Sequence, residues 1–535
     1  MEIEKGNKRS MEMVEKEVEI EGNKKRNNYQ RGGIRTLPFI FGNEICDRFA
    51  SAGFHSNLIS YLTQELNMPL VSASNTLTNF GGMSSFTPLI GALFADSFVG
   101  RFWTITIGCL IYELGLISIT ISTILPYFRP EPCPTQVNCQ EATFSQLSTL
   151  YISLLLTSLG SGGIRPCVVP FSADQFNMTK NGSPLVRLAQ VIVAAVKKRN
   201  EKLPNDLKLL YQNKELDAGI SSEGTLLHSD QYKWLDKAAI VIEKDAKDSN
   251  VLSPNLWNLV TVHRVEELKS IIRMLPIWAS GILLIASSSH IHSFMIQQAR
   301  SMDRRLSHSF QISPAHMSIF SVLTMMTGVI LYDRLFVPFA RRFTKNPVGI
   351  TCLQRMGVGF VINIVATIVS ALVEIKRKNV AAEYNLLDDP KAIIPISVFW
   401  LVPQYCLHGV AGVFIFVGHL EFLFDQSPES MRSSATALYC ITTAIGSYLG
   451  TLLVSLVHKY TDKEKNWLPD RNLNRGRLDY YYFFVSGIQV LNLIYYIICT
   501  WFYTYKSLDE VCERNKEEDL DEGDANISVE NLKDG

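Results

Sequence analysis

Five polar side chains recur on one face of an otherwise apolar stretch, residues 36–62. At about 100° per residue a single helical stripe holds Glu44, Asp47, Arg48, Ser51 and His55. Each charge costs roughly 2.5–3.5 kcal/mol at the centre of a membrane helix, so intramembrane charges are functional by default. The sequence therefore predicts that this stripe lines a water-filled path or the interior of a helix bundle.

A simpler interpretation is a local ion pair, because Glu44 precedes Arg48 by four residues. Asp47 argues against the pair as the whole explanation, since one arginine cannot neutralise two carboxylates. The second carboxylate is a proton-accepting group whose neighbours and burial set the pH at which it titrates. Both interpretations stay open on the sequence alone.

Long uncharged runs identify the chain as a polytopic membrane protein, although its average composition resembles that of a large soluble one. Of the 535 residues 47% are hydrophobic and 19% are charged, with a formal net charge of zero. Charge collects in the first 35 residues, in a central block and in the tail. Between them lie ten runs of spanning length, four before the central block and six after it: 36–62, 71–95, 102–125, 147–170, 270–287, 316–339, 351–373, 392–416, 435–457 and 480–503.

The charges around the first run predict its orientation. No apolar signal segment precedes it, and the arm at 1–35 ends in basic residues, so we expect this arm in the cytosol. Successive spans cross the membrane in opposite directions, so the block at 177–268 and the acidic tail at 506–535 are expected in the cytosol too. This alternation also puts basic clusters at 300–305 and 376–378 outside, which the positive-inside rule does not favour.

The central block opens with an amphipathic segment. Residues 185–196 are apolar on one side and end in Lys197, Lys198 and Arg199, which fits a helix lying on the cytosolic membrane surface. The remainder is polar and mixed in charge, which is typical of a mobile connector.

The fourth run carries a glycine-rich stretch at 160–166 that superficially resembles a phosphate-binding loop. No Lys-Ser/Thr pair follows it, and it lies inside an apolar span, so close helix packing around Arg165 is the better interpretation. As a permanently charged, forked donor, Arg165 suits either a carboxylate-bearing substrate or the carboxylates of the first span.

Two cysteines differ from the other eight, which mostly sit singly in apolar runs. Cys133 and Cys139 lie in a proline-rich loop that we expect to face the oxidising side, where a disulfide is plausible. No Cys/His spacing suggests a zinc site, so we expect no metal and no cofactor.

Several stretches together resemble one family, the proton-dependent oligopeptide transporters, in the plant nitrate/peptide branch and most like its subfamily 3. They are residues 44–48, which match the family's E-x-x-E-R/K, and 91–101, 160–176, 265–278 and 418–432. The resemblance implies an all-α fold of the major facilitator type, in which two six-helix bundles alternate access to a site at the midplane. In this chain, hydropathy predicts four spans before the central block and six after it. The chain passes from Phe176 almost directly to the Gly-Ser-Pro-Leu that opens the connector, so we expect that the family's fifth and sixth helices are missing.

The resemblance also implies roles for individual residues. Glu44, Asp47 and Arg48 take part in proton coupling, with Asp47 in place of the usual glutamate, and Arg165 replaces the common lysine of the fourth helix and contacts substrate together with His55. Gate or structural roles fall to four charged residues of the matching stretches 91–101 and 418–432: Asp96, Arg101, Glu421 and Arg432.

Two positions of the second helix group depart from the family pattern. The usual tenth-helix glutamate aligns with Gly412, which removes a carboxylate. A histidine that binds nitrate in some relatives aligns with Ser288. His290 lies two residues further on and should point away, as an ordinary polar residue at a helix end.

We therefore expect a symporter in the plasma membrane that takes up a small anionic or carboxylate-bearing solute, such as nitrate, nitrite, a short peptide or a plant hormone, with protons. The alternative is a truncated isoform that does not transport and is inactive or associates with a full-length relative. Nothing indicates nucleic-acid binding. An intramembrane hydrolase lacks both a second catalytic acid in its own motif and a metal-ligand set.

Overall fold

The structure is a computed structural model that describes residues 37–95, 100–133, 139–174, 184–204, 209–217, 226–242, 255–307, 310–344, 349–428, 432–461 and 466–505. The expected cytosolic arm and acidic tail lie outside these residues. The chain divides into two compact units. The first combines residues 1–57, 87–121 and 149–179, and the second combines residues 58–86, 122–148 and 180–535.

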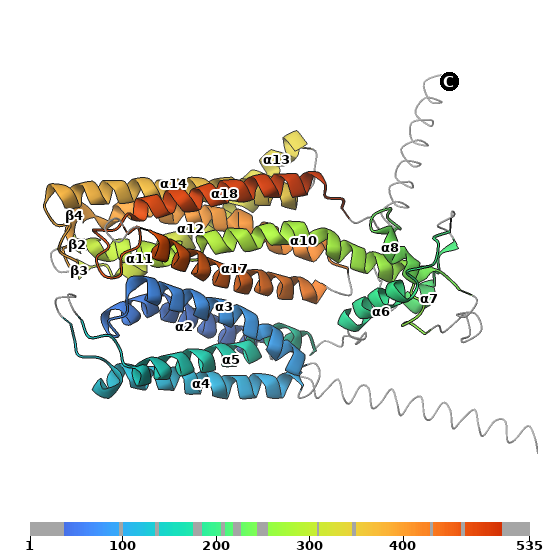
Figure 1. Cartoon of the computed structure of the whole chain (residues 1–535), viewed down its shortest axis with the longest axis horizontal. Coiled ribbons are helices and arrows are strands. Elements are labelled where there is room, and N and C mark those ends of the chain that lie inside the picture. Colours follow the sequence, from blue (N-terminus) through green and yellow to red (C-terminus); the bar gives the residue numbers. More distant parts are fainter. Residues whose placement is uncertain are drawn as a thin grey trace, which may run out of the picture. The chain divides into compact units, whose positions relative to one another are not determined.

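Helices make up most of the described chain, and four short strands lie in loops at one end of the second unit (Figure 1). The strands pair as β1 with β4 in parallel and β2 with β3 in antiparallel. The longer helices are α2 Leu37–Gln64, α3 Leu70–Phe94, α4 Arg101–Ile124, α5 Phe144–Asp174, α6 Pro184–Lys197, α10 Val262–Ser288, α11 Ile291–Ser301, α12 Ile319–Leu331, α13 Val337–Thr344, α14 Cys352–Glu383, α15 Val402–Gly412, α16 Gly418–Gln426, α17 Arg432–Tyr460 and α18 Leu478–Trp501. The short elements are η3 Pro126–Phe128, α7 Lys214–Asp217, α8 Lys233–Asp236, η5 Lys237–Ala239, β1 Met302–Asp303, β2 Arg305–Ser307, β3 Phe310–Gln311, η6 Pro314–Ser318, η7 Tyr332–Phe336, β4 Ile394–Ser397, η8 Val398–Leu401 and η9 Val413–Val417.

Each of the ten predicted runs contains a long helix or a series of consecutive helices. Among the described residues, eight of them are long and apolar enough to cross a membrane. The remaining two, α2 and α3, have 28 and 25 residues, which is enough for a bilayer, but they fall outside that criterion. The charged stripe of α2 and the polar small residues of α3 account for this.

Glycines bring α5 close to α3 and α4 in the first unit. A Cβ placed at Gly162 would lie 2.5 Å from Thr87 Cβ, and one at Gly160 would meet the Tyr112 backbone. Thr87 Oγ1 also donates a hydrogen bond of 2.8 Å to the Ser158 carbonyl. Small residues let helices approach this closely in lipid, so the glycine-rich stretch serves helix packing, as predicted.

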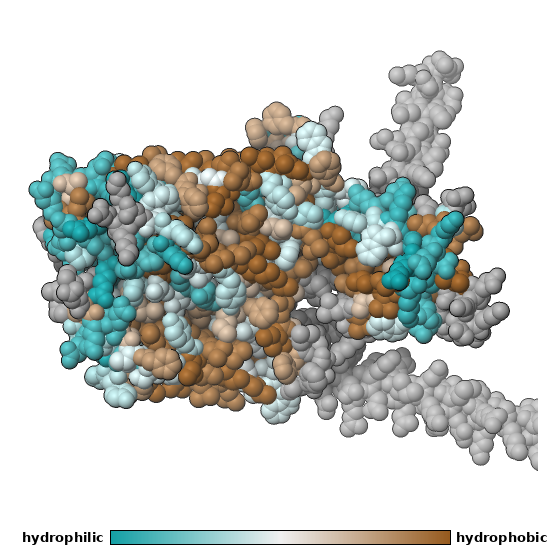
Figure 2. All heavy atoms as spheres, in the orientation of Figure 1, coloured by the Kyte–Doolittle hydropathy of each residue, from teal (hydrophilic) through white to brown (hydrophobic). Residues whose placement is uncertain are grey.

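The second unit is built around α10 and α14. Helix α10 packs against α17 and α18, and α14 packs against α15 and α18. Figure 2 shows hydrophobic residues over the middle of these helices, with hydrophilic residues at the end that carries the β strands and over the central block at the other end. This distribution matches a bilayer around the helices and water at both ends.

Helix α3 passes from the second unit to the first between Phe86 and Thr87. Pro88 lies inside the helix immediately after this boundary. Proline has no N–H group, so the helix lacks one of its backbone hydrogen bonds at this point.

The central block is folded in its described parts, which corrects the prediction of a mobile connector. The predicted amphipathic helix is present as α6. Apolar side chains of α6, α8 and the start of α10 form one buried cluster that includes Val191, Leu235 and Val265. Periodicity could reveal α6, but it could not reveal a core assembled from short segments far apart in the sequence.

Buried ion pairs fix the central block, called the linker from here on, to α10. The Lys269 ammonium lies 2.7 Å from Asp236 Oδ1 and 2.8 Å from Glu266 Oε1, and the exposed fractions of the three side chains are at most 1%. Arg273 adds a contact of 3.2 Å to Glu266 Oε2. Some of the charged residues in this block therefore pair with one another in its interior.

One of the two basic clusters that alternation places outside is internally paired. Arg377 is fully buried, with Nη2 at 2.7 Å from Glu374 Oε1, and it donates from Nη1 to Asn474 Oδ1 at 2.6 Å. Lys378 Nζ donates to the Gly476 carbonyl. The cluster at 376–378 is therefore not an open basic patch.

Candidate functional site

A charge pair joins α2 to α5 inside the first unit. Asp47 Oδ2 lies 3.8 Å from Arg165 Nε, and Arg165 Nη2 donates to Ser51 Oγ at 3.2 Å. The exposed fractions of the two charged side chains are 13% for Asp47 and 30% for Arg165. The structure thus brings together three residues that the sequence singled out, Asp47, Ser51 and Arg165.

The pair is charged but loosely bonded. A separation of 3.8 Å exceeds hydrogen-bond length. Among the described residues, neither Asp47 Oδ2 nor Arg165 Nε has a hydrogen-bond partner, although both atoms are buried. Unpaired buried polar atoms cost free energy, so each atom here is available to another partner. A proton on Asp47 and an anion on Arg165 are the partners that this chemistry accepts.

The other residues of the predicted stripe are only partly described. Glu44 and Arg48 lie on α2, but their side chains lie outside the described part of the structure. His55 is half-buried on the same helix, with its ring edge-to-face against Phe54 at 6.4 Å. No contact in the described part joins His55 to Arg165, so its substrate contact stays a prediction.

The predicted gate residue Glu421 forms an ion pair with Arg355 of α14. The Arg355 guanidinium also lies over the Tyr332 ring, 4.2 Å from its centroid. The pair therefore ties α16 to α14 and to the π-helical segment η7 between α12 and α13. Asp96 and the side chains of Arg101 and Arg432 lie outside the described residues.

Gly412 leaves open space where the resemblance implies a carboxylate. A Cβ built there would meet only Met325 Sδ, at 3.9 Å. Ser288 faces an amide cluster, because its hydroxyl accepts from Asn363 Nδ2 at 3.3 Å and from Gln489 Nε2 at 3.2 Å. The second unit thus presents neutral polar groups at Ser288 and no polar side chain at Gly412.

His290 lies at the junction of α10 and α11, so the prediction of a polar helix-end residue is confirmed, and the residue is buried and bonded there. It lies between α10 and α11 with no exposed surface, and its ring nitrogens contact Asn75 Oδ1 and Ser289 Oγ, each at 2.9 Å. Asn75 in turn donates to Ser455 Oγ at 3.0 Å. Two asparagines four residues apart on α3, Asn75 and Asn79, were the sequence signal for this polar contact.

The predicted disulfide is confirmed, because Cys133 and Cys139 are bonded to each other. Within the described part of the chain, one group of side chains has the arrangement of metal ligands, namely His228, Asp236 and Glu266. The Lys269 ammonium already lies within 2.8 Å of both carboxylates, so its positive charge occupies the position a cation would take.

Comparison with known proteins places this geometry in one family. The profile of the POT family, PTR2, matches residues 102–182 and 177–468. NRT1/PTR FAMILY 3.1 of Arabidopsis thaliana is 49% identical, with 92% of this chain and 94% of the relative covered. NRT1/PTR FAMILY 8.5 of the same plant is 36% identical, over 88% and 90% of the two chains.

Solved structures share the fold. The crystal structure of the POT family transporter PepTSo matches with a TM-score of 0.59 and 18% identity, over 88% of this chain and 98% of that one. An auto-inhibited POT family peptide transporter matches with a TM-score of 0.58, over 89% and 98%. The fold is therefore of the major facilitator type found in POT transporters.

One alignment contains more positions than this chain fills. The alignment with NRT1/PTR FAMILY 3.1 has 562 positions, whereas 92% of 535 residues is about 490, so about 70 positions have no residue from this chain. The two segments matched by the family profile meet at residues 177–182, just after α5. A stretch of about 70 residues is long enough for two membrane helices with their connections.

Proposed function

The chain belongs to the POT family of transporters, and from this premise we propose that it is a symporter of protons and a small anionic or carboxylate-bearing solute. Nitrate, nitrite, short peptides and plant hormones are the candidate substrates. We place it in the plasma membrane with both termini in the cytosol. Residues 36–176 would form a four-span bundle, 177–268 a cytosolic linker, and 269–505 a six-span bundle.

The observation that carries this proposal is the loose pair of Asp47 and Arg165. When Asp47 takes up a proton, its charge is lost and Arg165 has no counter-ion in the pair. The guanidinium then binds an anionic group of the substrate, because a charged forked donor prefers carboxylate or oxyanion acceptors. Loss of the proton restores the pair and releases the anion, which couples the two binding events.

Glu44 and Arg48 complete the proposed coupling group. Glu44 is the second proton acceptor, and Arg48 exchanges between the two carboxylates as their charges change. Each net charge moved inward gains about 2.3 kcal/mol per 100 mV of membrane potential. If more protons enter than the substrate has negative charges, net positive charge moves inward. Both the membrane voltage and the pH gradient then drive uptake.

The test is uptake by the purified full chain in proteoliposomes, with nitrate as the first probe. The double variant Glu44→Gln, Asp47→Asn should lose accumulation against a gradient and keep downhill exchange, because substrate binding survives when proton coupling is removed. Arg129→Gln, in an exposed loop pair with Glu65, is the matched control for loss of a charge. Accumulation that still depends on pH in the double variant would refute the proposed coupling.

A second candidate function follows from the alignment positions that this chain does not fill. A chain without the fifth and sixth helices would leave the packing faces of its first four helices uncovered in lipid, so it would be inactive or would associate with a full-length relative. The meeting point of the two matched segments and the absent carboxylate at Gly412 favour this candidate.

The length of the native transcript separates the two candidates. Amplification across the codons of Asn177 and Gly182 gives either one product of the length encoded here or one about 210 nucleotides longer, since about 70 positions are absent. A single longer product would assign the gap to the gene structure and remove the second candidate. A short product whose protein co-purifies with a longer relative and shows no uptake alone would support it.

A further inference from the structure

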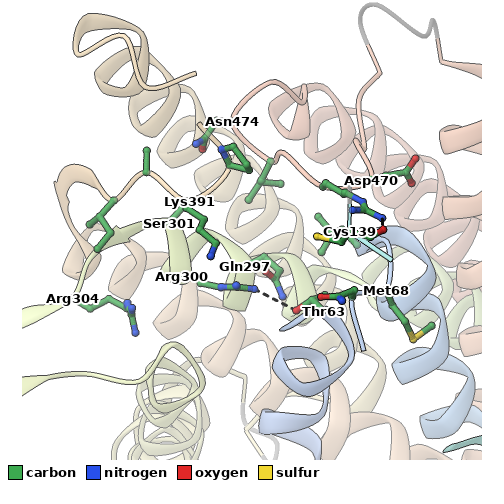
Figure 3. Close-up of a pocket in the computed structure, with 17 residues that line it drawn as sticks. Thr63, Met68, Cys139, Gln297, Arg300, Ser301, Arg304, Lys391, Asp470 and Asn474 are labelled. Carbon is green, nitrogen blue, oxygen red and sulfur yellow. Dashed lines mark hydrogen bonds between the residues drawn. The ribbon is translucent and has the colours of Figure 1, made fainter. Parts of the chain in front are cut away.

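A cavity of about 270 Å³ lies in the second unit, at the end that carries the β strands (Figure 3). Its walls come from the corner between α2 and α3, the end of α11, and the loops at 390–393 and 470–474. Cys139, one half of the disulfide, also lines it. No residue of the pair between Asp47 and Arg165 takes part, so this is a separate cavity.

Positive charge dominates its lining. The lining contains one carboxylate, Asp470, and four cationic side chains: Arg300, Arg304, Lys391 and Arg471. The carboxylate is engaged elsewhere, because Asp470 Oδ1 lies 3.3 Å from His458 Nε2. Arg471 has its own partner, Glu141, at 3.7 Å.

The other three cations have no acidic partner in the described part of the chain. Arg300 donates to neutral oxygens only, namely Thr63 Oγ1 at 3.4 Å and the side-chain oxygen of Gln64, in its favoured amide orientation, at 2.9 Å. Arg304 donates to the Ile312 carbonyl at 3.3 Å. Like charges gathered in a partly buried space repel each other, so an anion among them lowers the energy.

Unused hydrogen-bond donors point to the same ligand. Gln297 lines the cavity with an exposed fraction of 8%, and its Nε2 has no partner. Arg304 Nε and Arg471 Nη1 are likewise buried without a partner in the described residues. Figure 3 shows Gln297 beside Arg300 and opposite Thr63. Buried donors left unpaired cost free energy that an acceptor in the cavity would recover.

We propose that this cavity binds a small oxyanion, nitrate or the carboxylate of a small acid. Arg300, Arg304 and Lys391 supply the charge, and Gln297 supplies a neutral donor. The forked guanidinium groups match the spaced oxygens of such anions better than a spherical chloride. Under the orientation predicted from the sequence, the cavity opens to the outside and binds the anion before it reaches the helix bundles.

Equilibrium binding tests the proposal without any transport step. The full chain is reconstituted in phosphatidylcholine nanodiscs, and its unfolding temperature is followed while sodium nitrate replaces sodium chloride at constant ionic strength. We expect a saturable rise, with the half-saturating nitrate concentration at least tenfold higher in Arg300→Gln and in Lys391→Gln. The exposed Arg305, outside the lining, provides the control Arg305→Gln, which should behave as the parent chain.

The variants separate this site from the proposed transport site. Lys391 is exposed, so Lys391→Gln is expected to fold even where Arg300→Gln does not. The nitrate titration is repeated in the variant Arg165→Gln. If the rise in unfolding temperature persists in this variant and is lost when Arg300 or Lys391 is also replaced, the nitrate binds in the cavity. A response that is absent in the parent chain, or unchanged in Lys391→Gln, would overturn the proposal.

A lipid headgroup offers the same anionic chemistry, and the nanodisc composition distinguishes it. If phosphatidylglycerol in the nanodisc raises the unfolding temperature by itself and abolishes the nitrate response, the ligand is a headgroup phosphate and the assignment to a soluble anion is wrong. If the nitrate response persists with phosphatidylglycerol present, the soluble oxyanion is supported.

Discussion

Arg377 and Glu374 lie one turn apart on α14 as a charge pair with no exposed surface on either side chain. Removing one member of a buried pair leaves the other charge without compensation, at a cost of about 3–5 kcal/mol. We therefore expect Glu374→Gln to lower the apparent unfolding temperature of the purified chain strongly.

An exposed pair supplies the control for this prediction. Arg475 and Asp388 lie 2.7 Å apart, with exposed side-chain fractions of 68% and 78%. Exposed pairs contribute about 0–1 kcal/mol, so Asp388→Asn should change little. Equal unfolding temperatures for the two variants would show that burial of the pair between Arg377 and Glu374 has no energetic consequence.

The contact between α5 and α3 at Gly162 should leave no room for a side chain at that position. A methyl group there would lie 2.5 Å from Thr87 Cβ, and such overpacking typically costs about 1–3 kcal/mol. Gly162→Ala should therefore destabilise the first unit, whereas Gly81→Ala, with nothing within 4 Å of its added Cβ, should not. Unfolding monitored by cysteine accessibility at the buried Cys167 measures the difference, and equal accessibility would contradict it.

The lysine at the centre of the linker network should hold the linker on α10. Lys269→Met leaves Asp236 and Glu266 as neighbouring buried carboxylates without their shared cation. We expect faster trypsin cleavage within residues 184–261 under native conditions. Asp230→Asn breaks an exposed pair with Lys233 without removing a trypsin site, so it is the control and should leave the rate unchanged. Cleavage of both variants at the parent rate would show that the network does not fix the linker.

Arg165 should affect substrate binding more than turnover. Under the proposed function, Arg165→Gln removes the charge that binds the anion, so KM for nitrate should rise at least tenfold, or about 1.4 kcal/mol. Arg165→Lys keeps the charge but not the fork, and its KM should lie between the two. A variant that lowers kcat with an unchanged KM would assign Arg165 to the conformational step instead.

Hydrophobic runs were sufficient to locate the membrane helices. All ten predicted runs overlap long helices or series of helices, because a bilayer requires a minimum apolar length that single-sequence hydropathy detects directly. The run 392–416 begins earlier than its helices, just before strand β4, and ends before them. The amphipathic helix α6 was predicted for a similar reason. The folded linker was not, since its core combines short segments such as α8 with the start of α10.

Tertiary contacts decided the residues for which the sequence was ambiguous. Arg165 had two possible partners, and the structure shows the carboxylate of Asp47 beside it. The burial of His290 depends on Asn75, which lies more than 200 positions earlier in the chain. The sequence placed Arg377 in a basic cluster on the outer side of the membrane, and it could not show that Glu374 and Asn474 contact its side chain.

Pro88 has a consequence for how the chain bends. The backbone hydrogen bond that proline cannot make falls within two residues of the boundary where α3 leaves one compact unit and enters the other. A helix is most compliant where its backbone bonding is interrupted. The chain passes between the units at five places, and at the one inside α3 we expect the helix to bend more easily than an uninterrupted helix would.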